Sequence, residues 1–180
     1  ISIQSAVDQG ATITFRFPIN PSLFAPLDQV RIAEVAGGPS GRILVVDDET
    51  AVRCTLHDIL AEGGHQVILA ASGEEAVRLF QACPVDLVVT DLGMPGMNGL
   101  EVARALKAHS SNTPVVLVTG WGGVAEDARG SPDVDRVLSK PFRVRDVLDA
   151  VRELLSRSRA DMNRESRRGE PHGPSSDLED

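Results

Sequence analysis

Residues 43–48 are Ile43-Leu44-Val45-Val46-Asp47-Asp48, four apolar residues followed directly by two acids. A short, continuous apolar run of this kind is typical of a parallel strand that is buried on both faces. Charged side chains are costly to bury without partners, so we expect the strand to reach the edge of its sheet at Asp47. The stretch therefore predicts an α/β fold with polar chemistry at one rim of the sheet.

Four more short apolar runs follow, and each suits a further buried strand. They are Val67-Ile68-Leu69, Leu87-Val88-Val89, Val115-Val116-Leu117-Val118 and Arg136-Val137-Leu138. Helical patterns separate the runs. Apolar residues recur at helical spacing in two segments, first at Val52, Leu56, Ile59 and Leu60 and later at Val144, Val147, Leu148, Val151 and Leu155.

Further helix starts are indicated by capping residues, Ser72 with Glu75 and Asn98 with Glu101. The helix between the last two strands has the weakest pattern, because Gly130 and Pro132 interrupt it. Alternating strands and helices predict an α/β domain with a doubly wound, five-stranded parallel sheet and helices on both faces. Ligands bind such sheets at the carboxyl ends of the strands.

Composition narrows the class of protein. The chain has 180 residues, a net charge of -8 and 42% hydrophobic residues, as is usual for a globular protein. No apolar run approaches the roughly 18 residues needed to cross a membrane, and neither end resembles a signal peptide. The negative charge argues against nucleic-acid binding, although a small basic cluster spans Arg164 to Arg168. Cys54 and Cys83 give no disulfide framework, so we expect a cytoplasmic setting.

The two ends of the chain differ from its middle. Alternating residues at Ile13 to Phe17, a similar run at Ile1 to Ile3, and turn residues at Asp8 to Gly10 predict a hairpin. Because the chain starts at Ile1 and not at Met, we expect it to be a piece of a longer protein. Composition then predicts a hairpin region at 1–20, a Pro- and Gly-rich linker at 21–41, one domain at 42–156 and a disordered tail at 157–180.

Polar side chains follow the predicted strands. Asp47 and Asp48 follow the first strand, Asp91 the third, Thr119 the fourth and Lys140 the fifth, which places all five at one rim. Three carboxylates converging there would repel each other unless a cation neutralised them, and oxygen ligands suit Mg²⁺. A lysine and a hydroxyl beside them could hold a phosphoryl group and stabilise its transfer.

Four segments resemble those of response-regulator receiver domains, in the order and spacing of that family. They are Val45 to Glu49, Thr90 to Gly99, Val118 to Gly120 and Ser139 to Phe142, and the resemblance runs from Arg42 to about Leu155. It implies a flavodoxin-like receiver fold and a phosphoacceptor in two-component or phosphorelay signalling, not an enzyme. The implied partner is a histidine kinase or a histidine phosphotransfer protein, while the oligomeric state stays open.

The resemblance implies a role for each matching residue of the phosphorylation site. Asp91 would attack the phosphorus of a phosphohistidine, and Lys140 would pair with the phosphoryl oxygens. Thr119 would move toward the phosphoryl group and carry the conformational switch. The family also has a cis peptide bond at the position of Pro141.

The resemblance likewise implies a set of ligands for Mg²⁺. Asp48, Asp91 and the backbone carbonyl of Gly93 would bind the ion directly, and Asp47 would reach it through water. Gly93 and Trp121 stand where the family's side chains tune the loss of the phosphoryl group. The family often has Tyr or Phe where this chain has Val137, which leaves open how a switch would work here.

Residues 8–18, Asp8 to Pro18, resemble the closing strands of a histidine-kinase ATPase domain. That resemblance implies a hybrid histidine kinase with its receiver at the C-terminal side. The kinase's nucleotide-binding and phosphodonor motifs are not present in this chain.

Two other functions remain as alternatives. The first is a receiver-like docking module that is never phosphorylated, and the second is a phosphatase with an aspartyl nucleophile. Such phosphatases carry a second acid two residues after the nucleophile, whereas Gly93 stands there in this chain. Cys54 and His57 have a spacing that could bind a metal, but no second pair completes a tetrahedral site.

Overall fold

The computed structural model describes residues 2–6, 10–14, 40–120 and 130–168. In the unit Ile1–Arg31, β1 (Ser2–Ala6) pairs antiparallel with β2 (Gly10–Thr14). The predicted hairpin is confirmed over these residues. Its turn, Phe15 to Phe17 and nearly all of the expected linker lie outside the described residues.

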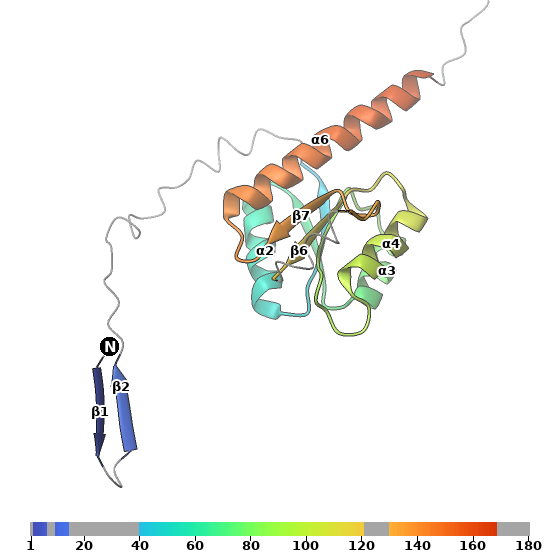
Figure 1. The fold of residues 1–180 in the computed structure, drawn as a ribbon. Helices are drawn as coiled ribbons and strands as arrows, with labels where there is room; N and C mark the ends of the chain where they lie inside the picture. Colours follow the sequence, from blue (N-terminus) through green and yellow to red (C-terminus); the bar gives the residue numbers. More distant parts are fainter. Residues whose placement is uncertain (1, 7–9, 15–39, 121–129, 169–180) are drawn as a thin grey trace, which may run out of the picture. The chain divides into compact units, whose positions relative to one another are not determined.

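The unit Ile32–Asp180 contains a five-stranded parallel sheet (Figure 1). Its strands stand in the order β4-β3-β5-β6-β7, and every neighbouring pair is parallel. They are β3 (Arg42–Val46), β4 (Gln66–Ala70), β5 (Leu87–Asp91), β6 (Val115–Thr119) and β7 (Arg136–Ser139). The chain passes from β3 outward to β4 and then returns to β5 on the other side of β3. The loops that follow β3 and β5 therefore lead in opposite directions, which leaves a crevice between them at the carboxyl ends of these strands.

Helices lie on both faces of this sheet, which confirms the predicted fold class (Figure 1). They are α2 (Thr50–Glu62), α3 (Gly73–Ala82), α4 (Gly99–His109) and α6 (Val144–Arg168). The helix expected between β6 and β7 falls mainly on residues 121–129, outside the described part of the chain.

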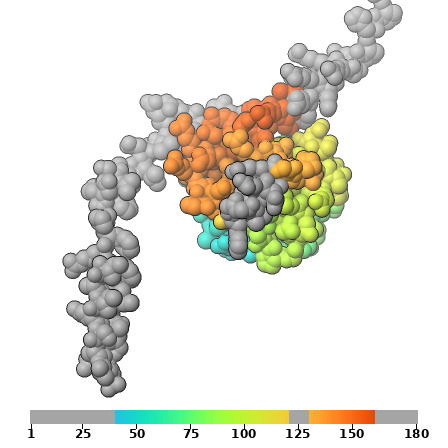
Figure 2. Space-filling model, in the orientation of Figure 1, coloured from blue at the N-terminus to red at the C-terminus, as the bar shows by residue number. Residues whose placement is uncertain are grey.

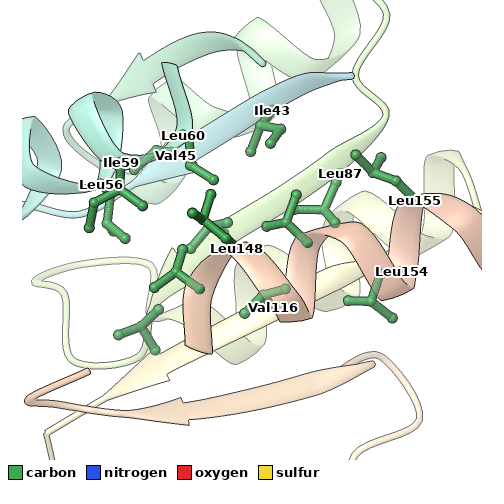
Figure 3. Packing of buried hydrophobic residues seen from close by; sticks show 14 residues of the cluster. Ile43, Val45, Leu56, Ile59, Leu60, Leu87, Val116, Leu148, Leu154 and Leu155 are labelled. Carbon is green, nitrogen blue, oxygen red and sulfur yellow. The ribbon is translucent and has the colours of Figure 1, made fainter. Parts of the chain in front are cut away.

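Alternate residues of the buried strands supply two separate apolar cores. One core joins α2 and α6 to one face through Ile43, Val45, Leu87, Val116 and their neighbours, with Leu148 and Leu155 from α6 (Figure 3). The other joins α3 and α4 to the opposite face through Leu44, Val46, Val88 and Val115. β5 and β6 are buried along their whole length, as the continuous apolar runs predicted.

Both predicted helix caps are confirmed. The Ser72 side chain accepts a hydrogen bond from the Glu75 backbone N–H at 3.2 Å. The Asn98 side chain accepts from the backbone N–H groups of Leu100 and Glu101, and the Glu101 carboxylate in turn accepts from Asn98 N–H. This reciprocal capping box begins α4 just after the loop that follows Asp91.

The expected disordered tail at 157–180 needs correction over its first part. α6 continues without a break to Arg168, well past Leu155, the last buried residue among those of α6 up to residue 160, where the description of burial ends. Residues 157–168 are mostly good helix formers, no Gly or Pro occurs before Gly169, and Arg157 pairs with Glu153 one turn earlier. On the face drawn in Figure 2, the orange-to-red atoms of residues 130–160 cover one part of the surface and yellow-green atoms cover another.

Within the described part of the chain, no helix combines the length and apolar character required to span a membrane.

Candidate functional site

Parallel strand ends bring four of the predicted side chains to one rim. Asp91 and Thr119 are the last residues of β5 and β6, while Asp47 and Lys140 come directly after β3 and β7. The register places Asp91 beside Val118. Asp47, Asp91 and Thr119 are all buried, so the rim is a recess and not a solvated edge.

Lys140 joins the two buried aspartates. Its Nζ lies 2.7 Å from Asp91 Oδ1 and 3.1 Å from Asp47 Oδ2. The Asp47 side chain is only 1% exposed and that of Asp91 9%, so both ion pairs are shielded from water. Charge-assisted hydrogen bonds in such surroundings are stronger than those between neutral groups.

Burial and these contacts shift the pKa values of Asp47 and Lys140. Burial raises the pKa of Asp47 above its usual value, although hydrogen bonds from Lys140 and from Glu49 N–H act in the opposite direction. Burial by itself would lower the pKa of Lys140, but its hydrogen bonds to Asp91 and Asp47 outweigh burial and raise it. Lys140 is therefore a fixed cation beside Asp91 at neutral pH.

Main-chain hydrogen bonds hold the loops around Asp91. The backbone N–H of Gly93 donates to Asp91 Oδ2 at 2.6 Å, and Leu92 N–H donates to the Val118 carbonyl at 2.8 Å. Lys140 N–H donates to the Thr119 carbonyl at 2.7 Å, which ties the loop after β7 to the end of β6. The Lys140–Pro141 peptide bond is cis, as the resemblance implied.

An open cleft of about 510 Å³ lies over this rim. Its lining includes Asp48, Asp91, Gly93, Thr119 and Lys140. All but one of the predicted site residues therefore face one space, and the exception, Asp47, reaches that space through Lys140. The cleft has room for a phosphoryl group together with its surrounding ligands.

The expected convergence of three carboxylates is not formed. Asp48 lines the cleft but its side chain is exposed, and the described residues hold no group of three or more His, Cys, Asp or Glu side chains that could bind a metal. The physical reason is repulsion: the single charge of Lys140 offsets part of the repulsion between the two buried carboxylates, and the third carboxylate stays in water. The oxygen-only donor set still fits Mg²⁺ chemically.

The sequence patterns did not identify two residues that lie near the rim. Arg53 donates from Nη1 to the Asp47 carbonyl at 2.5 Å and from Nη2 to Thr50 Oγ1 at 3.2 Å. Gly99 lies against the Asp91 main chain, where a Cβ would overlap the Asp91 carbonyl oxygen. Gly99 had no predicted role beyond membership in the segment Thr90 to Gly99. The sequence around Arg53 also does not show which group its side chain contacts.

Cys54 and His57 have a spacing that could bind a metal, but the sequence offers no second pair of ligands to complete the site. Cys54 is exposed on α2, and His57 contacts Asp58 at 3.0 Å.

Val137, which replaces the family's aromatic residue, is partly buried in β7. Trp121 lies outside the described residues.

A parallel sheet in this strand order, with buried aspartates and a lysine at its carboxyl rim, defines the CheY-like class of α/β domains. The chain belongs to the response regulator receiver domain family, whose sequence pattern matches residues 43–152. It is a phosphoacceptor receiver domain of two-component signal transduction.

Individual relatives agree with this assignment. Response regulator MprA of Mycolicibacterium vanbaalenii is 40% identical over 121 residues, covering 67% of this chain and 52% of that protein. MprA of Mycobacterium bovis is 38% identical over 128 residues, covering 71% and 56%. The chain thus spans about half the length of these relatives.

Solved structures show the same fold. A receiver domain protein from Clostridium thermocellum superposes with a TM-score of 0.62 at 28% identity, covering 66% of this chain and 97% of that one. Chemotaxis protein CheY4 of Vibrio cholerae gives a TM-score of 0.60 at 27% identity, covering 64% and 99%.

Proposed function

We propose that Asp91 is the phosphoacceptor of this domain and that Lys140 and Thr119 assist it. The observation that carries the proposal is the position of Lys140, whose Nζ lies 2.7 Å from Asp91 Oδ1 at the floor of an open cleft. A buried carboxylate held by a fixed cation, and facing a cleft, suits an oxygen nucleophile that must accept a highly charged group.

The transfer follows from this arrangement. An oxygen of Asp91 forms a bond to phosphorus as the bond from phosphorus to the phosphohistidine nitrogen breaks, and the bonding electrons return to the imidazole ring. The product is an acyl phosphate on Asp91. Lys140 neutralises the phosphoryl oxygens, and the N–H of Gly93, now bonded to Asp91 Oδ2, keeps the carboxylate oriented.

Asp47, Asp48, Asp91 and the carbonyl oxygen of Gly93 would hold Mg²⁺ in this proposal. The ion would supply positive charge to the phosphoryl oxygens during transfer. Asp48 already lines the cleft with an exposed carboxylate, so it is available as a ligand. Asp47 is held by Lys140 and by Glu49 N–H, which suits a water-mediated contact better than a direct one.

The donor is a phosphohistidine, presented by a cognate histidine kinase or by a histidine phosphotransfer protein. Phosphorylation would bias a surface formed by β7 and α6, through Thr119. The Lys140 N–H to Thr119 carbonyl bond connects the end of β6 to the loop that enters α6, and it supports this route. A few kcal/mol of differential stabilisation would suffice for such a shift.

The experiment is intact mass after incubation with Mg²⁺ and acetyl phosphate. The parent should gain one phosphoryl group, and Asp91→Asn should gain none. Asp86→Asn is the matched control at the opposite end of β5, because asparagine keeps the side-chain oxygen that accepts from Arg42 N–H. No gain by the parent in closely spaced, rapidly quenched samples would overturn the proposal in favour of the unphosphorylated docking module.

We also propose that the hairpin is the end of a histidine-kinase ATPase domain, so that the parent protein is a hybrid kinase. The pairing of β1 with β2 in a unit separate from the receiver supports this interpretation. The test is the coding sequence on the N-terminal side of Ile1, which should encode nucleotide-binding motifs and a phosphodonor histidine. An unrelated domain there would contradict the proposal.

A further inference from the structure

Arg53 reaches back from the first turns of α2 onto the acidic turn that follows β3. Its Nη1 donates to the Asp47 carbonyl at 2.5 Å, and its Nη2 donates to Thr50 Oγ1 at 3.2 Å. Its backbone N–H donates to the Glu49 carbonyl at 3.0 Å. The side chain and main chain of one residue therefore bracket the short turn 47–50.

The Asp47 carbonyl belongs to the peptide that joins Asp47 to Asp48. Fixing that carbonyl fixes the plane of the peptide and so limits where the Asp48 side chain can point. The opposite side of the turn is held by the Asp47 carboxylate, which accepts from Glu49 N–H at 2.8 Å. Asp48 itself is exposed and lines the cleft, so its direction depends on this turn.

The two acceptors of Arg53 are neutral oxygens, a carbonyl and a hydroxyl. Among the ion pairs between described residues, none involves Arg53. Its planar guanidinium is thus used as a two-pronged donor to the turn and not as the partner of a carboxylate. Lysine, with a single flexible ammonium, could not reproduce both bonds in fixed geometry.

We infer that Arg53 is a positioning residue that orients Asp48 for divalent-cation binding. The inference rests on the proposed function, in which Asp48 binds Mg²⁺. The positive charge of Arg53 has an opposing effect, because repulsion between this charge and the ion weakens Mg²⁺ binding. Orientation and charge predict opposite signs when Arg53 is replaced by a neutral side chain, so experiment can separate them.

The test is a Mg²⁺ titration of the full chain followed by two-dimensional ¹H–¹⁵N NMR, with the amide signals of Asp48 and Gly93 as reporters. Positioning predicts that Arg53→Met weakens Mg²⁺ binding by about tenfold, the usual effect of losing a residue that orients a ligand. Arg53→Lys should recover part of the loss. Arg157→Met, at an exposed arginine on α6, is the control and should bind like the parent.

A second readout separates positioning from general damage. At saturating Mg²⁺, the rate of phosphorylation of Arg53→Met by acetyl phosphate should return close to the parent rate, since the chemistry does not use Arg53. A rate that stays low at saturation would overturn the inference, as would Mg²⁺ binding by Arg53→Met as tight as in the parent or tighter. If the parent gives no Mg²⁺-dependent shifts at Asp48 and Gly93, the proposed ligand set itself fails, and the inference with it.

Discussion

Lys140 Nζ stands between two buried carboxylates, 2.7 Å from Asp91 Oδ1 and 3.1 Å from Asp47 Oδ2. Its side chain is 21% exposed, whereas that of Asp47 is 1% exposed. The cation therefore has two effects. It orients the Asp91 carboxylate, which is the proposed nucleophile, and it makes the burial of Asp47 beside that carboxylate tolerable.

Removing this cation should destabilise the fold as well as slow phosphorylation. We expect Lys140→Met to lower the free energy of unfolding at pH 7 by about 2 kcal/mol, less than for a fully buried pair. Urea denaturation measures the change. Adding Asp47→Asn should restore part of the loss, because it removes one of the carboxylates left unpaired. A double variant less stable than Lys140→Met alone would contradict this account.

Thr119 should separate phosphorylation from its structural response. Thr119→Ala leaves Asp91, Lys140 and their contact in place, so acetyl phosphate should still add one phosphoryl group. The shifts of β7 and α6 amides in NMR spectra of the phosphorylated domain should shrink, because the hydroxyl is lost. The control is Thr113→Ala, which removes a buried threonine just before the other end of β6. Unchanged amide shifts in Thr119→Ala would rule out its role as the switch.

Gly99 should be intolerant of any side chain. A Cβ there would overlap the Asp91 carbonyl oxygen and lie 2.8 Å from Leu117 Cδ1, so α4 would have to move away from β5. We expect Gly99→Ala to cost about 2 kcal/mol of stability and to slow phosphorylation of Asp91. Gly120→Ala is the control for stability, since a Cβ at that position meets nothing within 4 Å. Equal stability of the two variants would show that α4 adjusts without cost.

His65 should make stability depend on pH below neutrality. Burial lowers its pKa below the usual 6.5, and its Nδ1 accepts from Gly41 N–H at 3.3 Å, which requires the unprotonated nitrogen. The unfolded chain thus binds a proton more readily than the folded one, so stability is lost as pH falls through 6.5. Thermal unfolding between pH 7.5 and about 5.5 should show a shallower slope for His65→Gln than for His109→Gln, an exposed histidine. Parallel slopes would refute the assignment.

Sequence patterns predicted the strands and the rim because both follow from one physical rule. An apolar run must be buried and the acid that ends it must reach a polar edge, so the amino-acid sequence alone was enough to assign Asp47, Asp91, Thr119 and Lys140 to the rim. The contacts among them depend on side-chain direction, which spacing does not give. That is why the pairing of Lys140 with Asp47 and the exposed position of Asp48 were not foreseen.

The predictions that were wrong or missing each have a physical reason. The polar composition after Ser156 indicated disorder, yet helix propensity and charge pairing extend α6 to Arg168. Arg53 could not be predicted because its target is a main-chain carbonyl, which every residue has. Gly99 was quoted only as part of a longer segment, and its missing Cβ, which lets α4 approach Asp91, leaves no pattern in the sequence.

The sheet divides the apolar interior of the receiver into two cores, one beneath α2 and α6 and the other beneath α3 and α4. Val151 lies in the first and Val102 in the second, with the buried strands between them. The free-energy losses of Val151→Ala and Val102→Ala should therefore add within about 0.5 kcal/mol in a double-mutant cycle. The two helical layers can then vary independently in evolution, as long as both continue to pack against the strands that they share.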